Sequence, residues 1–255
     1  MISFEEIKKH YNEQENQLPR AILKEYLQYK ILEIIFSSPF SNKIIFMGGT
    51  SLRIIYGSDR FSEDLDLDNQ GLNKKDFTKL MSIIKTEFKK EGINTEIRNV
   101  FKGVYRCYLK FPKILFANNL SPLAEEKILI QIDSYKMNKN IKPIIRVVNK
   151  VDVFTEIRVY SPDILLAQKI FALLNRKRAK GRDIYDIVYL FSLTQPNWDL
   201  LKKYTKIDNL KSLKAKLSTT FSLTELKTLA KDVEPFLINP KKIIQIEKFN
   251  QWLNQ

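Results

Sequence analysis

The change of pattern at Ser161-Pro162 constrains the fold of this 255-residue chain more than any other feature. Before it, short β-rich segments alternate with amphipathic helical segments, whereas after it only helical spacing remains. A serine followed by proline suits the N-cap and first turn of a helix. The sequence therefore predicts an α/β domain over residues 1–160, followed by an all-helical domain over residues 161–255.

The individual elements follow from the period of the apolar residues and from the turn residues between them. In the first part we expect helices over 18–36 and 74–90, a short helix over 50–56 that ends at Gly57, and strands over 43–47, 65–68, 126–135 and 144–160, with a hairpin around Gly103 in 93–111. In the second part we expect helices over 162–175, 183–193, 198–204, 208–217, 222–233 and 240–253.

The composition excludes several classes of protein. One cysteine cannot form an intramolecular disulfide, and one cysteine with one histidine cannot build a structural zinc site, so a catalytic metal would need carboxylate ligands. The start of the chain lacks a signal-peptide pattern, and no segment approaches the roughly 18 apolar residues of a membrane span. We therefore expect a cytoplasmic protein without a membrane partner.

The charge indicates the kind of partner. The chain carries a formal charge of +14, of which residues 1–160 contribute +6 and residues 161–255 contribute +8. Such a charge favours a polyanionic partner. Nucleic acid is the first candidate, because Lys and Arg side chains that neutralise its phosphates release bound counterions. A Lys-rich solvated surface is the alternative explanation.

The densest chemical signal begins at Gly48-Gly49, directly after the first predicted strand. Adjacent glycines allow a close approach to the main chain, and the N-terminus of the next helix offers free N–H groups to a phosphate. Thr50 and Ser51 add hydroxyl donors there. A plain tight turn is the competing interpretation, and no P-loop pattern exists in the chain.

Asp64 and Asp66 lie two residues apart and would point to one face of a strand, where like charges suit a divalent cation. We expect Asp68, nearest the strand end, to face solvent. Asp133, on the strand 126–135, would share its face with Leu129 and Gln131 and supply a third ligand. The competing interpretations are a solvated edge strand and a strand-terminal turn residue.

Three strings in the chain, GGTSLR, RFSEDLDL and KGRDIYDIVYL, together resemble the AbiEii-type nucleotidyltransferases, related to the MenT group and to the polymerase-beta-like superfamily. The resemblance spans about residues 18–195. It implies a mixed sheet with flanking helices, followed here by the all-helical domain, and transfer of a nucleoside monophosphate from an NTP to an acceptor hydroxyl. Members of the MenT group modify tRNA acceptor ends.

The resemblance also implies roles for residues. Gly48, Gly49 and Thr50 form the triphosphate-side loop, Ser62 and Asp64 match the family's Ser-x-Asp, and Asp66 completes the metal pair. Asp64 and Asp66, helped by Asp133, would then hold two Mg²⁺ or Mn²⁺ ions.

Lys169 also stands out because its helix is otherwise nearly all apolar. A partly desolvated ammonium needs a partner, for which the triphosphate is our prediction and a snorkelling side chain is the alternative. Asp183 and Asp186 follow on the next helix. The resemblance gives one of them the role of orienting Lys169 or assisting the acceptor, and we favour Asp183 without excluding Asp186.

Five basic residues lie between Lys169 and Asp183. A solvated loop is the default interpretation, and contact with nucleic-acid phosphates is our prediction. The residues are Arg176, Lys177, Arg178, Lys180 and Arg182.

The sequence thus predicts a metal-dependent toxin nucleotidyltransferase that uses an NTP and modifies RNA, most simply tRNA, and that would need an antitoxin. A small-molecule acceptor, as in antibiotic-modifying nucleotidyltransferases, is the first alternative, although the positive charge disfavours a cationic drug. A nucleotide-binding module without transfer activity is the second.

Overall fold

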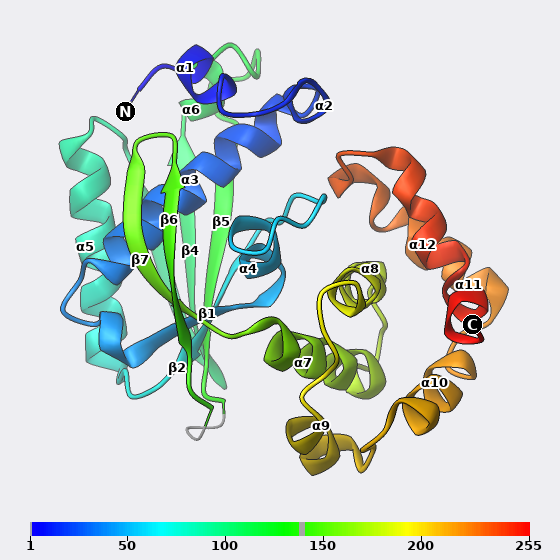
Figure 1. Ribbon diagram of the computed structural model, residues 1–255. Helices are drawn as coiled ribbons and strands as arrows, with labels where there is room; N and C mark the ends of the chain where they lie inside the picture. Colours follow the sequence, from blue (N-terminus) through cyan, green and yellow to red (C-terminus); the bar gives the residue numbers. More distant parts are fainter. Residues whose placement is uncertain (1, 138–140) are drawn as a thin grey trace. The chain divides into compact units, whose positions relative to one another are not determined.

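The computed structural model describes residues 2–137 and 141–255 (Figure 1). The chain forms two compact units. The first comprises residues 1–55 and 61–160, and the second comprises residues 56–60 and 161–255. The short segment 56–60 therefore belongs to the second unit, although it lies inside the α/β region of the sequence. A single boundary at residue 160 does not include this segment in the second unit.

The first unit is built around a mixed sheet. Among the described residues its seven strands are ordered β3-β4-β5-β2-β1-β7-β6. The strands are β1 (Ile44–Met47), β2 (Leu65–Asn69), β3 (Glu96–Lys102), β4 (Val104–Pro112), β5 (Lys127–Tyr135), β6 (Ile144–Lys150) and β7 (Val153–Val159). The pairs β2–β5 and β1–β7 are parallel, and the other neighbours are antiparallel. The predicted mixed sheet is confirmed, including the hairpin at Gly103, whose φ is +75°.

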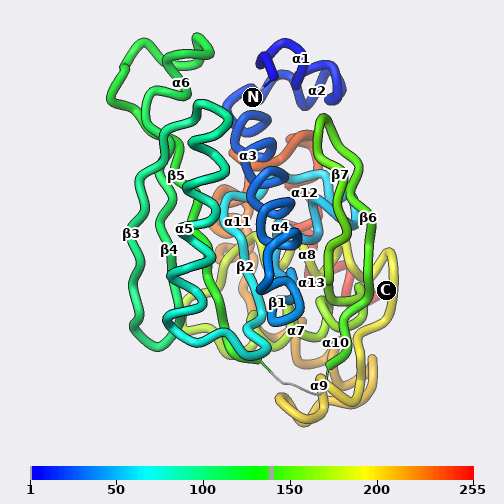
Figure 2. Tube along the Cα trace, turned by 90° about the vertical axis from the view of Figure 1, so that its left-hand side faces the viewer, coloured from blue at the N-terminus to red at the C-terminus, as the bar shows by residue number. Residues whose placement is uncertain are grey.

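Two long helices cover one face of this sheet. Figure 2 shows α3 (Pro19–Phe36) and α5 (Lys74–Lys90) side by side across the strands. The apolar stripe of α5 is fully buried and brings Phe77 against Phe101 and Tyr105 of the β3–β4 hairpin. The shorter helical elements are α1 (Phe4–Lys8), α2 (Glu13–Asn16), η1 (Ser41–Lys43), α4 (Gly48–Ile54) and α6 (Ile114–Ala117).

The helices and strands assigned to the described residues of the second unit are all helices, as the sequence predicts, and an isolated β-bridge joins Arg60 to Leu237. Its elements are α7 (Pro162–Asn175), α8 (Gly181–Phe191), α9 (Trp198–Thr205), α10 (Leu210–Ser218), α11 (Leu223–Lys231), η2 (Glu234–Phe236), η3 (Pro240–Ile243), α12 (Ile244–Glu247) and α13 (Phe249–Leu253). Helices α7 and α8 pack against each other, and α8 also contacts α11 and α12. The single helix expected over 240–253 is divided into η3, α12 and α13. The 3-10 helix η3 runs directly into α12, and the chain leaves helical dihedral angles at Lys248, between α12 and α13.

Packing explains the state of the lone cysteine. Cys107 is fully buried on β4, and burial raises the pKa of its thiol to about 12, so it behaves as a small core residue. A separate observation concerns membranes. None of the described helices combines the length and the apolar character that crossing a membrane requires.

Candidate active site

The turn that connects β1 to α4 is shaped by Gly48. Its φ is +80°, and a Cβ atom on this residue would lie 2.1 Å from Asp66 Oδ2. The close approach expected at the glycine pair is therefore made by a carboxylate of the protein itself. Gly48 is required both by its backbone conformation and by the space that Asp66 occupies.

The hydroxyl groups after the glycines are used within the protein. The Thr50 hydroxyl donates to the main-chain carbonyl of Asp64, and the Ser51 hydroxyl donates to the carbonyl of Gly48 at 2.8 Å. Both side chains are fully buried. They fix the turn and the segment that leads to the acidic residues. Binding of a triphosphate at Gly48, Gly49 and Thr50 stays a prediction.

The acidic residues lie where β2 begins. Asp64 directly precedes the strand and Asp66 is its second residue; both are half-buried, and Leu65 between them is fully buried. In the parallel pair β2–β5, Asp66 is in register with Asp133. In-register residues on neighbouring strands point to the same face and lie about 4.8 Å apart. Asp66 and Asp133 thus stand side by side because of the β2–β5 register, which the alternation of each strand by itself does not determine.

Asp133, however, is fully engaged by its neighbours. Arg106 on β4 donates to both of its carboxylate oxygens, at 2.6 and 2.8 Å, and the side chains of Gln131 and Tyr135 each donate to Oδ2 at 2.9 Å. Burial, followed by the nearby carboxylates of Asp66 and Asp133, raises the pKa of the Tyr135 hydroxyl, so it remains a donor.

The residues at this edge fit a divalent cation only in part. The described part of the chain contains no group of three metal-ligating side chains, and Asp133 is an ion-pair partner of Arg106. Magnesium is nevertheless commonly held by one or two carboxylates together with the phosphates of its nucleotide. Asp64 and Asp66 fit that kind of site, whereas a ligand role for Asp133 stays a prediction that requires Arg106 to release it.

The expectation that Asp68 faces solvent is wrong. Its side chain is completely buried, and it accepts hydrogen bonds from the main-chain N–H of Met137, at 2.8 Å, and from the side chains of Tyr160 and Gln70. Asp68 does share the face of Asp66, but Tyr160 covers it. The residue therefore has a structural role.

Lys169 lies in a buried cluster of charges in the second unit. Its ammonium is 2.8 Å from Asp186 and 3.1 Å from Asp183, both on α8. Burial by itself lowers the pKa of Lys169, but these carboxylates outweigh it and raise the pKa above its ordinary value. Lys169 is therefore protonated, and its partners in the protein are carboxylates.

Two arginines complete this cluster. Arg60 donates to both oxygens of Asp186, at 2.6 and 2.7 Å, and Arg176 donates to Asp183 at 2.7 Å. Arg60 and Asp186 are almost inaccessible, at 2% and 0% exposure. Burial acts to raise the pKa of Asp186, yet Arg60 and Lys169 together lower it below its usual range. Both aspartates left open by the sequence therefore contact Lys169, and Asp186 is the more deeply buried.

The family of the chain follows from its similarity to known proteins. The model of the family "Nucleotidyl transferase AbiEii toxin, Type IV TA system" matches residues 30–251. The chain belongs to the AbiEii family.

Two solved structures have a similar fold. JHP933 from Helicobacter pylori has a TM-score of 0.54 at 17% identity, and covers 92% of this chain and 91% of its own. A Helicobacter pylori protein described as a nucleotidyltransferase has a TM-score of 0.55 at 16% identity, with 92% and 94% covered. The search of curated proteins gave no match.

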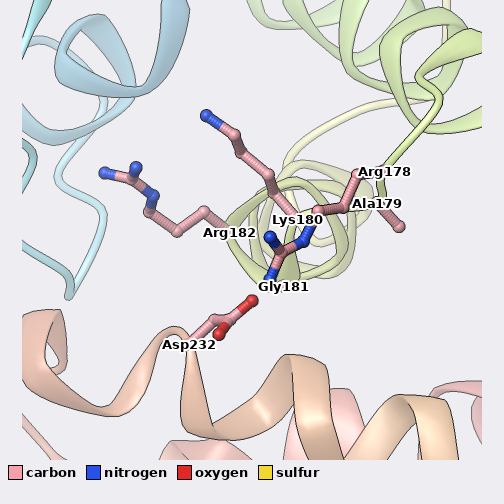
Figure 3. Close-up of a pocket in the computed structure, with 6 residues that line it drawn as sticks. All are labelled: Arg178, Ala179, Lys180, Gly181, Arg182 and Asp232. Atoms are coloured by element: carbon pink, nitrogen blue, oxygen red, sulfur yellow. The ribbon is translucent and has the colours of Figure 1, made fainter.

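For an AbiEii-family chain, the basic loop after α7 is the remaining feature of interest. The second unit has a hollow of about 270 Å³. Figure 3 shows the three basic side chains and Asp232 that border it. Its lining residues are Arg178, Ala179, Lys180, Gly181, Arg182 and Asp232. Of the five predicted basic residues, Arg176 belongs to the Lys169 cluster and Arg182 lies over the ring of Phe236 at 4.8 Å. Lys177, Arg178 and Lys180 are exposed.

Reasoning from the sequence missed Arg60 and Arg106. Each pairs with a carboxylate that was singled out, but across 126 and 27 residues of sequence, respectively. Arg60 stands directly before the acidic residues in RFSEDLDL, which was its only signal. Arg106 alternates with buried Cys107 on β4, so its orientation was predictable and its partner was not.

Proposed function

We propose that this AbiEii-family protein transfers a nucleoside monophosphate from an NTP to a hydroxyl group at the 3′ end of a tRNA. The observation that carries the proposal is the position of the Asp66 carboxylate against Gly48, with Asp64 two residues before it and Asp133 in register beside it. A carboxylate pair next to a glycine turn is the arrangement that phosphoryl transfer needs, because both the phosphates and their counter-ion must approach the main chain.

Asp64 and Asp66 would hold the divalent cation, Mg²⁺ or Mn²⁺, with the phosphates of the NTP as its other ligands. When bound, the cation withdraws charge from the triphosphate and lowers the pKa of the attacking hydroxyl. The protein's own part is positional. Thr50 holds the carbonyl of Asp64, and the β1–β2 pairing holds Asp66 opposite Met47. The acceptor oxygen attacks the α-phosphorus, and pyrophosphate leaves.

Lys169 is proposed to neutralise charge on the triphosphate. Its two carboxylate partners do not exclude this role, because within the cluster the three cations Lys169, Arg60 and Arg176 form ion pairs with two carboxylates, Asp183 and Asp186. These five side chains carry one net positive charge. An anion would balance it, while Asp183 and Asp186 keep the ammonium protonated and directed.

The acceptor is proposed to be RNA because the exposed cations on the loop after α7 are suited to contact a polyanion. Lys177, Arg178 and Lys180 lie on one short loop, and two of them line the hollow of Figure 3. Contacts of this kind bind phosphates irrespective of base sequence. Membership of a type IV toxin–antitoxin family also implies an antitoxin partner.

The test is incubation of the protein with Mg²⁺, each labelled NTP in turn and total tRNA, with the Asp64→Ala variant as control. We expect label in tRNA with one NTP, and sequencing of RNA 3′ ends should show the added nucleotide with the wild type alone. Label in a small molecule instead of RNA would replace the acceptor. Nucleotide binding without any transfer would refute the enzymatic proposal.

A further inference from the structure

The segment from Phe61 to Asp64 carries two proposed site residues, Ser62 and Asp64, but has no regular secondary structure. The main chain of such a segment is not fixed by a ladder of hydrogen bonds. Its position must come from side chains of the elements around it. Those side chains therefore decide where Asp64 lies.

The most deeply buried of these contacts from α3 comes from Gln28, in the middle of the helix. Its side chain is 1% exposed, and its amide nitrogen donates to the main-chain carbonyl of Ser62 at 3.0 Å. Its neighbours Leu27 and Ile31 are fully buried, so the helix at this point is held by the core. The amide thus ties a rigid helix to the main chain two residues before Asp64.

A second attachment comes from α4. Arg53 stacks on the ring of Phe61 at 4.7 Å, and its guanidinium is held by Glu25, with Nε to Oε2 at 2.7 Å, and by Glu15. The Thr50 hydroxyl holds the carbonyl of Asp64 from the same helix. The segment is therefore fixed at Phe61, Ser62 and Asp64 by separate side chains.

A third contact lies nearer the surface. The ammonium of Lys24 is 3.3 Å from Glu63, with exposed side-chain fractions of 20% and 41%. Partly exposed ion pairs of this kind restrain a segment weakly because water competes for both charges. Among the contacts from α3, the buried amide of Gln28 is the one able to define the main-chain position.

We infer that Gln28 is a positioning residue for the nucleotidyl transfer: it fixes the main chain at Ser62 and thereby the carboxylate of Asp64. The inference rests on the proposed function, which gives Asp64 its role. Gln28 touches neither substrate nor reacting atoms in this scheme. A displacement of about 1 Å in a reacting group can reduce a rate by about a hundredfold, so removal of a main-chain hydrogen bond two residues away should be visible in kcat.

The test compares Gln28→Met with Tyr26→Phe. Methionine retains the size of the side chain and removes the donor to Ser62. The control removes one part-buried hydrogen bond from the same helix, from the Tyr26 hydroxyl to Asp152 at 3.2 Å, without touching residues 61–64. We expect Gln28→Met to lower kcat about tenfold with the KM for NTP within about twofold, whereas Tyr26→Phe retains wild-type kcat.

Gln28→Asn is the second variant, because it keeps the amide but withdraws it by one methylene. It should give an intermediate kcat and covers the case in which Gln28→Met does not fold. The concentration of Mg²⁺ at half-maximal rate should rise in both Gln28 variants, since Asp64 is a proposed ligand, and it should not change in Tyr26→Phe.

The outcomes separate the two proposals. Transfer by the wild type with equal kcat in Gln28→Met and Tyr26→Phe would overturn the positioning role and leave the function standing. Absence of transfer by the wild type would overturn the proposed function and this inference with it.

Discussion

Replacement of Gly48 by alanine tests the core of the proposed site. An ideal Cβ atom at this position would lie 2.1 Å from Oδ2 of Asp66, 2.8 Å from its Cγ and 2.7 Å from its Cβ. Ordinary contacts between heavy atoms are about 3.5–4.0 Å, so the Asp66 carboxylate must move by more than about 1 Å. A shift of that size should reduce transfer about a hundredfold.

The same substitution also strains the backbone, since φ at Gly48 is +80°. An L-residue in this left-handed region costs about 1–2 kcal/mol, which corresponds to a fall in Tm of about 2–8 °C for a chain of this size. Gly92→Ala separates the two effects. Its φ is +77°, and a Cβ atom there meets no atom within 4 Å.

We therefore expect Gly48→Ala to lower Tm at least as much as Gly92→Ala, because it adds the clash with Asp66 to the same backbone strain, while only Gly48→Ala impairs transfer. The measurements are thermal unfolding without nucleotide and initial rates with labelled NTP and tRNA. If Gly48→Ala retained at least about a third of the wild-type rate, which is a change of less than about 1 kcal/mol in the barrier, the Asp66 carboxylate would not act where the structure places it.

Four further variants, three with a single substitution and one with a triple replacement, probe other parts of the molecule. Asp66→Asn should abolish transfer but leave Tm unchanged or raised, because it removes a negative charge beside Asp133; a rate near that of the wild type would exclude Asp66 as a metal ligand. Lys169→Met should lower turnover about tenfold and reduce the free energy of unfolding by about 1–3 kcal/mol. The reason is that Asp183 and Asp186 lose their ion pairs with Lys169 and keep those with Arg176 and Arg60. Unchanged kinetics would make Lys169 purely structural. Gly181→Ala should lower the free energy of unfolding by about 3 kcal/mol, because the new Cβ atom would lie 1.9 Å from the carbonyl oxygen of Leu229. The measurement is denaturant unfolding, and a midpoint equal to that of the wild type would contradict the close packing of α8 on α11. Joint replacement of Lys177, Arg178 and Lys180 by Gln should reduce the slope of log tRNA affinity against log salt concentration. The slope should fall by about 0.7–0.9 for each phosphate that the loop no longer neutralises. As the control, replacement of the exposed Lys75, Lys79 and Lys85 on α5 should leave that slope unchanged.

Much of the fold could be predicted because its elements carry strong local patterns. Helices α5 and α7 begin and end where the sequence places them, at Lys74–Lys90 and Pro162–Asn175. An apolar stripe at helical spacing specifies α5, and Pro162 specifies the start of α7. The order of the strands could not be obtained this way, because β2 pairs with both β1 and β5, and β3 and β4 lie between β2 and β5 in the chain.

The acidic residues show how far alternation along a strand reaches. It correctly assigns Asp66 and Asp133 to faces of their own strands, and the parallel register then brings the two together. It also assigns Asp68 to the face of Asp66, but exposure depends on what covers that face. Tyr160, 92 residues later, donates its hydroxyl to Asp68 and excludes solvent. Orientation is a local property of a strand, and burial is not.

The Lys169 cluster shows, for a helix, the same difference between a locally predictable property and its partner elsewhere in the chain. The apolar neighbours of Lys169 correctly indicate a desolvated ammonium that needs a partner. The partner carboxylates are three residues apart on α8, so both face α7 from successive positions on one side of the helix. A buried cation must be balanced by the protein before any ligand arrives, because the folded chain has to be stable without its nucleotide. A lysine in an apolar helix followed by Asp-x-x-Asp on the next helix therefore predicts an internal ion pair first, such as the one that Lys169 forms with Asp183 and Asp186 here.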